Sequence, residues 1–452
     1  MSRPGAHLIR GSREIRLGLL FSPVSIALFV FAPLLLLYVV TSESVFASEF
    51  QSRKALSVSG VVFFALAIAC FVVGARAGGR GVRGSTSASG QGVLIGPRRR
   101  SLAVLLEASL VISLGAYVIW FARGIVNAGG IPQLLEIWRT DPHRIKAELL
   151  TTIPGVTTLT QLAVAAIPLA IAFGLYRRGS ALRVLVALVF AFATVRAVLF
   201  NERLALVELM VPVAFLLLAP RRVSVPRVAI YAATFVVAAM TLFTVTELRR
   251  TYVYTNDFSA GKSATRFFGY YLTSVNNGMV VIDEYPARTP FYTTGELIWL
   301  FPGIRDLRVE YLPGLGTVSL GYADAFGVDP ETFWPRAFAA QGLDYEFNVF
   351  TAPGYLAADF GWAALIALFL LGLVSGRLYR QAETSSFHRA FYAIWLVGLL
   401  EFMRFLYVAN TRVFPVYLVL GAAYLIVRRS PAWRSSRAES LRPLRIGGAR
   451  DR

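Results

Sequence analysis

The sequence predicts an all-α protein that crosses a membrane about ten times. Hydrophobic residues make up 56% of the 452 residues, charged residues only 16%, and the mean hydropathy is +0.60. The apolar residues fall into runs of about 17 to 24, which match the roughly 20 residues that cross a bilayer as a helix. Because lipid offers no partners to backbone polar groups, runs of this length must form helices.

Ten apolar runs are long enough to be membrane spans. The first follows four arginines between Arg3 and Arg16, as a secretory signal would, but it is too long for one and is expected to remain uncleaved. The single cysteine, Cys70, lies in the second run and forms no intramolecular disulfide. The expected spans are 17–40, 56–74, 102–122, 152–176, 184–200, 204–220, 228–246, 355–375, 390–408 and 413–427.

The charge distribution orients these spans. With both termini inside, the inner segments carry 27 basic residues against four acidic ones, while the other 18 basic residues are mixed with most of the acids. An excess of Arg and Lys in short inner loops is the rule in membrane proteins. We therefore expect a multi-pass protein of the bacterial inner membrane with both termini cytoplasmic. Topology explains the net charge of +19, which makes nucleic acid the weaker choice of partner.

Four parts are expected along the chain. Residues 1–246 form the first seven spans, 247–354 a large external loop, 355–427 the last three spans, and 428–452 a basic cytoplasmic tail. That tail and the Gly- and Ser-rich segment 74–92 have too few apolar residues to bury a core. We expect both to contact anionic headgroups.

Two segments outside the membrane core are expected to be interfacial helices. The run 267–282 is apolar enough to resemble a span, but Asn276 and Asn277 make its insertion into lipid costly. We therefore predict an amphipathic surface helix there, and a similar one over 132–150 after the third span.

Absent motifs narrow the function. There is no Walker motif, no HExxH and no CxxC, and the only histidines are His7, His143 and His388. ATP-driven transport and a metal site rich in His or Cys are disfavoured, so neither a metal nor a cofactor is expected. An outward-facing reaction that needs a proton acceptor would use a carboxylate, a tyrosine or His143.

The hairpin between spans five and six concentrates charge at the outer surface. Arg196 and Arg203 are seven residues apart with Glu202 between them, and the short turn gives them little access to bulk water. Guanidinium groups are forked donors that suit the oxygens of a diphosphate. Alternatively, Glu202 neutralises one arginine while the other reaches the headgroups.

Other charged residues have both structural and functional interpretations. Glu401 and Arg404 are three apart in span nine, which favours a structural ion pair. Glu107 and Glu208 are single acids within spans, and each needs a partner that the sequence does not identify. The external arginines that we count as phosphate-binding candidates beside those of the hairpin are Arg249, Arg250, Arg266 and Arg336.

At the end of the large loop the sequence runs FNVFTAPGYLAADFGWAALIALFLLGLVSGRLYR, from 347 to 380. A polar segment meets the step Asp359, Phe360 and Gly361, and a span packed with small residues follows. This resembles the oligosaccharide repeat-unit polymerases, the O-antigen polymerase family, in which a helix beginning near Asp-Phe-Gly follows the large external loop. The hairpin at 196–203 also occupies the position where that family carries external arginines.

The resemblance implies metal-independent glycosyl transfer at the outer leaflet. The donor would be a glycan growing on undecaprenyl pyrophosphate, the acceptor a lipid-linked repeat unit, and the partners membrane lipids, a flippase and a chain-length regulator. Such a reaction needs cations for the departing diphosphate and a base for the acceptor hydroxyl. Asp359 and Glu202 are the catalytic candidates, with Asp344 and Glu346 as further acids. Asp359 has two other interpretations: it orients the loop, or it complements the dipole at a helix N-terminus.

Departures from the family pattern keep two other classes open. The hairpin has NERLAL where a small-residue step is expected, and His143 lies in a different loop from the external histidine of related ligases. A glycosyltransferase that uses polyprenyl-phosphate sugars would need an acidic pair in the first external loop, which has only the separated Glu43 and Glu49. A transporter of lipid-linked glycans would centre its charges at mid-membrane.

Overall fold

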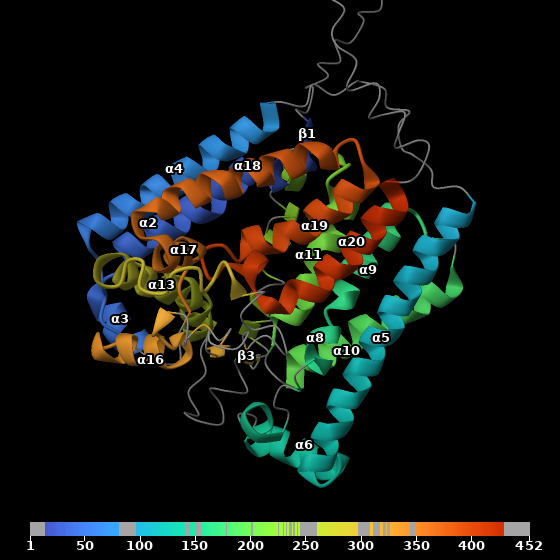
Figure 1. Cartoon of the computed structure of the whole chain (residues 1–452), viewed down its shortest axis with the longest axis horizontal. Coiled ribbons are helices and arrows are strands. Elements are labelled where there is room, and N and C mark those ends of the chain that lie inside the picture. Colours follow the sequence, from blue (N-terminus) through green and yellow to red (C-terminus); the bar gives the residue numbers. More distant parts are fainter. Residues whose placement is uncertain are drawn as a thin grey trace, which may run out of the picture.

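The computed structural model shows a bundle of helices (Figure 1). The structure describes residues 14–80, 96–141, 144–149, 153, 155–177, 179–199, 202–224, 260–296, 308–310, 317–319, 322, 326–343 and 349–428, with isolated pieces between 226 and 244.

Within the described residues, six helices are long and apolar enough to cross a membrane, and three shorter helices are also apolar. They correspond to nine of the ten predicted spans. The predicted span 228–246 lies partly outside the described residues and stays a prediction. Three of the six are single helices: α4 (Val58–Arg80), α5 (Pro97–Ala128) and α10 (Ser180–Leu199). The other three are composite: Pro23–Val40 contains α1 (Pro23–Ile26), the π-helical η2 (Ala27–Phe31) and α2 (Ala32–Val40); Ala352–Ala382 contains α17 (Ala352–Phe360), η5 (Gly361–Ala363) and α18 (Ala364–Ala382); Thr411–Arg428 contains η7 (Thr411–Val413) and α20 (Phe414–Arg428). The shorter ones are Val156–Ala172, which contains α8 (Val156–Leu159) and α9 (Leu162–Ala172), then α11 (Leu204–Leu218) and α19 (Ser386–Leu400).

The remaining elements are short or lie at the ends of the bundle. Two pairs of three-residue strands are the only strands among the described residues, so the protein is helical in all its larger elements. These elements are η1 (Leu17–Phe21), α3 (Glu43–Phe50), α6 (Ile131–Thr140), η3 (Ile145–Leu149), α13 (Ala260–Glu284), α16 (Pro330–Ala340), η6 (Tyr407–Ala409), β1 (Glu14–Arg16) paired with β2 (Arg222–Ser224), and β3 (Arg308–Glu310) paired with β4 (Thr317–Ser319).

The closest helix pair is α4 with α18, which lie side by side in Figure 1. We call their contact the glycine seam, because Gly74 and Gly78 of α4 face Gly372 and Gly376 of α18. A Cβ atom built on any of the four would collide with a backbone carbonyl oxygen of the other helix. Both helices carry the GxxxG spacing, which lets helix backbones approach closely within a membrane.

A second core surrounds α9, a helix of 11 residues that is almost entirely buried. Its neighbours are α5, α11, α19 and α20. At 1.5 Å per residue, α9 is only about 16 Å long, much shorter than the bilayer core of about 30 Å. Its apolar residues therefore face protein rather than lipid.

The prediction of a surface helix over 267–282 is wrong. This segment is part of α13, which packs against α2, α4 and α17 and buries Asn276 completely. Asn276 accepts hydrogen bonds from the Tyr38 hydroxyl (2.9 Å) and the Ala55 amide (2.7 Å) and donates to the Arg53 carbonyl (2.9 Å). Buried polar groups are stable when they are satisfied in this way, so the asparagine lies in a protein core and not at a lipid surface.

The segment predicted as a helix over 132–150 is helical in two pieces. α6 ends at Thr140 and η3 begins at Ile145. α6 is mostly exposed, with Leu134 packed on a small core around Tyr117 and Trp120 of α5.

The first described residues lie at one end of the bundle. β1 pairs with β2, and Arg16 lies 3.3 Å from Glu383 at the end of α18, so these segments share that end. In Figure 1 this end is at the top, near β1, whereas α3 and α16 lie at the lower left and α6 at the bottom. The first end is the one that the sequence assigns to the cytoplasm.

Candidate functional site

Arg196, in the last turn of α10, is buried although it is charged, with an exposed fraction of 5%. Its Nε and Nη2 atoms lie 2.6 and 2.5 Å from Oε2 of Glu202, and Nη1 donates to Oγ1 of Thr160 at 3.0 Å. The guanidinium also lies 4.7 Å from the ring centre of Trp120. The turn between α10 and α11 thus folds Glu202 back over Arg196, as the structural interpretation of this pair expects.

A second ion pair joins α11 to the segment before α20. Glu208 has no exposed surface and receives Arg412 on both oxygens, with Nε 2.8 Å from Oε1 and Nη2 donating to Oε2 at 3.0 Å. The Tyr407 hydroxyl donates to the same carboxylate at 3.0 Å. The sequence marks Glu208 as an acid in need of a partner, and the structure identifies Arg412, which sequence reasoning missed.

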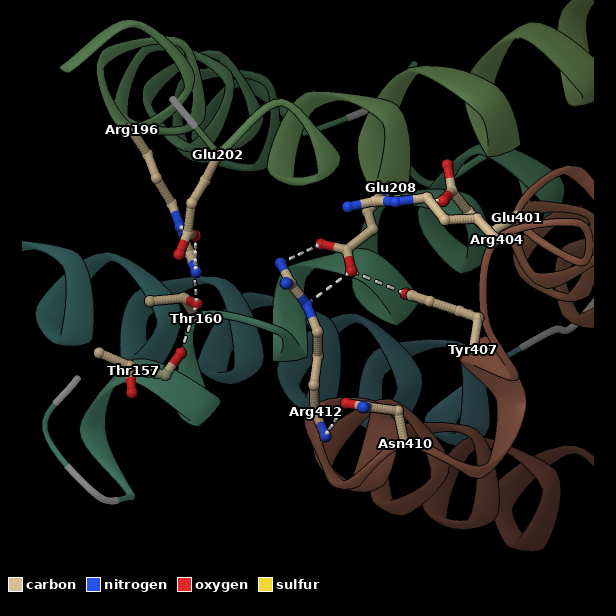
Figure 2. Close-up of polar contacts among 10 residues, drawn as sticks. All are labelled: Thr157, Thr160, Arg196, Glu202, Glu208, Glu401, Arg404, Tyr407, Asn410 and Arg412. Carbon is tan, nitrogen blue, oxygen red and sulfur yellow. Dashed lines mark hydrogen bonds and ion pairs between the residues drawn. The ribbon is translucent and has the colours of Figure 1, made fainter. Parts of the chain in front are cut away.

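These two ion pairs are neighbours, as Figure 2 shows. The Tyr117 side chain of α5 lies within electrostatic range of Arg196, Glu208 and Arg412. The charge of Glu202 also acts on Arg412. We call Arg196, Glu202, Glu208 and Arg412 the paired cluster; its charges sum to zero. Because desolvated arginines are stable only when compensated, each glutamate holds one guanidinium in place.

Two further arginines meet at one aromatic ring. Arg203 lies 3.8 Å from the ring centre of Phe243 and 5.6 Å from that of Tyr270, on α13. Arg404 lies 5.6 Å from the same Tyr270 ring, and its Nη1 is 3.1 Å from Oε2 of Glu401. The predicted pairing of Glu401 with Arg404 is confirmed, in the turn that follows α19.

Asp359 lies in the last turn of α17 and is 2% exposed. Its carboxylate accepts hydrogen bonds from the backbone amides of Thr293 (3.1 Å) and Thr294 (2.8 Å) and from the Thr294 hydroxyl (2.9 Å). The interpretation of Asp359 as an acid at a helix N-terminus is therefore wrong. This geometry matches the loop-orienting role, because the carboxylate oxygens are already used by Thr293 and Thr294.

The segment from Tyr285 to Glu296, which Asp359 holds, is conformationally constrained. Ala287 and Phe291 have positive φ angles of 55° and 58°, which are costly for residues other than glycine. Hydrogen bonds from Ala287 and Thr289 to α17 carbonyls also fix this segment. Such strain persists only where surrounding contacts impose it.

Glu296 ends this segment, and sequence reasoning did not single it out. Its Oε1 accepts from the Thr411 amide (3.2 Å) and hydroxyl (3.1 Å), directly beside Arg412 in the chain. Burial raises the pKa of this carboxyl group, and the two hydrogen bonds from Thr411 oppose the shift. No Lys or Arg within the described ranges forms an ion pair with it. No sequence pattern marks it, because its contact with Thr411 joins residues that are 115 positions apart in the chain.

The other predicted phosphate-binding arginines are not gathered with the paired cluster. Arg266 is half-buried on α13, and Arg336 is exposed on α16, at the side of the bundle away from α10 in Figure 1. Arg249, Arg250, Asp344, Glu346 and His143 lie outside the described residues. In the part of the chain that the structure describes, no group of three or more His, Cys, Asp or Glu side chains is placed to hold a metal ion.

No protein-family model, no curated protein and no solved structure matches this chain.

Proposed function

We propose that this protein transfers a glycan from one polyprenyl diphosphate carrier to another lipid-linked repeat unit at the outer face of the membrane. The observation that carries the proposal is the paired cluster, in which glutamates hold the buried Arg196 and the partly exposed Arg412 at the end of the bundle assigned to the outside. A diphosphate is the ligand that paired forked donors suit best.

The paired cluster is neutral as a whole, and what it offers a ligand is guanidinium groups that are already in position. Glu202 and Glu208 hold Arg196 and Arg412 in fixed positions before a ligand arrives, so little reorganisation is needed when negative charge develops. Arg203 and Arg404, which flank Tyr270, place two further guanidinium groups toward α13. Together they would stabilise the diphosphate as it leaves the donor sugar.

Glu296 is the carboxylate that fits the role of base. Glu202 is bound to a guanidinium and Asp359 to its loop, whereas Glu296 accepts hydrogen bonds only from Thr411 within the described chain. In the proposed step the acceptor hydroxyl oxygen attacks the anomeric carbon, and Glu296 takes the hydroxyl proton. The bond between the anomeric carbon and the diphosphate oxygen breaks, and its electron pair leaves with the lipid diphosphate. A raised pKa makes Glu296 a stronger base.

Conservative substitutions test the phosphate-binding role. Arg196→Lys and Arg412→Lys keep a positive charge beside each glutamate but lose the forked geometry. We expect cells with either variant to accumulate single lipid-linked repeat units at normal protein level. Arg139→Gln, on the exposed surface of α6, is the matched control and should leave chain length unchanged. Long glycan chains in both lysine variants would refute the proposal.

The base is tested separately with Glu296→Gln, which preserves an acceptor oxygen for Thr411. We expect chain growth to stop while donor binding persists. If Glu296→Gln polymerises normally and the lysine variants do not, the base assignment fails and glycosyl transfer stands.

A transporter of lipid-linked glycans is the second candidate, favoured by the complete burial of Glu208 inside the bundle. The two functions differ in where the intermediate accumulates. Loss of a transporter leaves single repeat units on the cytoplasmic leaflet, and loss of a polymerase leaves them on the outer leaflet. A transferase that uses polyprenyl-phosphate sugars, the remaining alternative, is distinguished by the donor that the purified protein consumes.

A further inference from the structure

A pocket opens at the end of the bundle opposite the paired cluster. It lies between η1, the end of α11, the end of α18 and the start of α19, and we call it the basic pocket. Its lining includes Arg16, Phe215, Ala219, Tyr379, Glu383 and Arg389.

Positive charge in the basic pocket exceeds negative charge. Arg16 and Arg389 are close enough to repel each other. The carboxylate of Glu383 lies 3.3 Å from Arg16 and 3.6 Å from Arg380, so these two guanidinium groups share one acid and Arg389 adds a further positive charge. An anion in the pocket would relieve this repulsion.

Contacts with the backbone hold the basic pocket in shape. Arg389 donates Nε to the carbonyl of Ala382 at 3.1 Å, which fixes its side chain at the C-terminus of α18. The Tyr379 hydroxyl donates to the Gly18 carbonyl at 2.9 Å and ties the first described turn to α18. The pocket is therefore built by tertiary contacts.

The surroundings favour a lipid over a free anion. Leu19 and Leu20, in the turn directly after Arg16, are 55% and 37% exposed, and Leu217 near the end of α11 is 51% exposed. Phe215 and Ala219 form the apolar wall of the pocket itself. A cationic site beside exposed apolar side chains at the end of a membrane bundle matches a headgroup above its acyl chains.

We propose that the basic pocket binds the headgroup phosphate of an anionic phospholipid in the leaflet at this end of the bundle. Arg16 and Arg389 contact the phosphate oxygens, and the acyl chains lie along Leu19, Leu20 and Leu217. The bound lipid fastens the N-terminal segment to α18 and α19. This role is independent of glycosyl transfer.

Native mass spectrometry of the purified full chain tests the proposal. Phosphatidylglycerol, phosphatidylcholine and inorganic phosphate are offered separately, and retained adducts are counted. The wild-type protein should retain phosphatidylglycerol over phosphatidylcholine. The double variant Arg16→Gln/Arg389→Gln should lose about tenfold in affinity for phosphatidylglycerol, as expected when charge-assisted hydrogen bonds are removed.

Arg100→Gln is the matched control, because Arg100 is exposed at the start of α5, where the sequence places the same membrane side. Thermal unfolding without lipid verifies that each variant is folded. If the double variant unfolds, Arg16→Gln alone serves, since this side chain is 49% exposed and tolerant of change. The proposal is overturned if the double variant keeps its lipid preference, if Arg100→Gln loses as much, or if inorganic phosphate displaces the lipid.

Discussion

The glycine seam and the paired cluster stabilise the same bundle by different means. In the seam, α4 and α18 approach closely because four glycines have no side chain, and the two backbones pack directly against each other. In the paired cluster, α10, α11 and the segment before α20 are joined by charges that compensate one another inside the protein. A backbone contact has no room to relax, whereas an ion pair tolerates removal of both partners better than removal of one.

The largest effect should come from breaking the seam. Gly376→Leu puts a side chain against the backbone of Ala75, so the helices must separate, at a cost of about 3 kcal/mol or more. Folded yield and thermal unfolding in detergent measure it. The control is Gly421→Leu on α20, where a Cβ meets no atom within 4 Å. Equal stability of the two variants would show that the close approach is not needed.

Breaking one ion pair should cost slightly less. Arg412→Gln leaves Glu208 buried without its cation. Such a loss costs about 3–5 kcal/mol in a fully buried pair, but the Arg412 side chain is 25% exposed, so we expect about 2–3 kcal/mol, partly recovered by Glu208→Gln/Arg412→Gln. Denaturant unfolding of the single and double variants measures the difference. Arg144→Gln removes an exposed partner of Glu148 and should cause no detectable change. A double variant less stable than the single would contradict this account.

A smaller, local effect is expected at Asp359. Asp359→Ala removes three hydrogen bonds from Thr293 and Thr294. Thr293 is buried, so its unsatisfied amide costs about 1–3 kcal/mol, whereas Thr294 is exposed and its donors can bind water. Hydrogen exchange should quicken from Tyr285 to Glu296 and stay unchanged in the glycine seam. Glu49→Gln, on an exposed face of α3, is the control. If hydrogen exchange from Tyr285 to Glu296 is unchanged in the Asp359 variant, Asp359 does not orient this loop.

The smallest effect is a pH dependence at Glu296. Because its folded-state pKa is raised, the neutral form is favoured by folding, and this contribution is lost as pH rises through the raised pKa. Glu296→Gln cannot ionise, so its melting temperature relative to the wild type should rise between about pH 4 and pH 7. A constant difference across this range would mean that burial does not govern this carboxyl group.

The helices were predictable from the sequence because hydropathy is a local property. The partners of buried polar side chains were not, because they lie far away in the chain. The apolar runs that become α4, α5 and α18 are visible in any short window of sequence. The partners of Asn276 and Glu208 lie more than 190 residues away, so the sequence assigned Asn276 to a surface and left Glu208 unpaired. Arg196 and Glu202 were predictable together because one short turn joins them.

The shortness of α9 bears on how salt affects the ion pairs of the paired cluster. Thr160, which precedes α9, accepts a hydrogen bond from Arg196, so this arginine lies beside the start of α9. α9 has 11 residues, whereas the neighbouring α5 has 32. Arg196 and Glu208 are buried, whereas Glu202 and Arg412 are 24% and 25% exposed, so each ion pair has one buried and one partly exposed member. Dissolved ions reach only the exposed member, and a rise in ionic strength should therefore weaken these pairs less than it weakens a fully exposed surface pair.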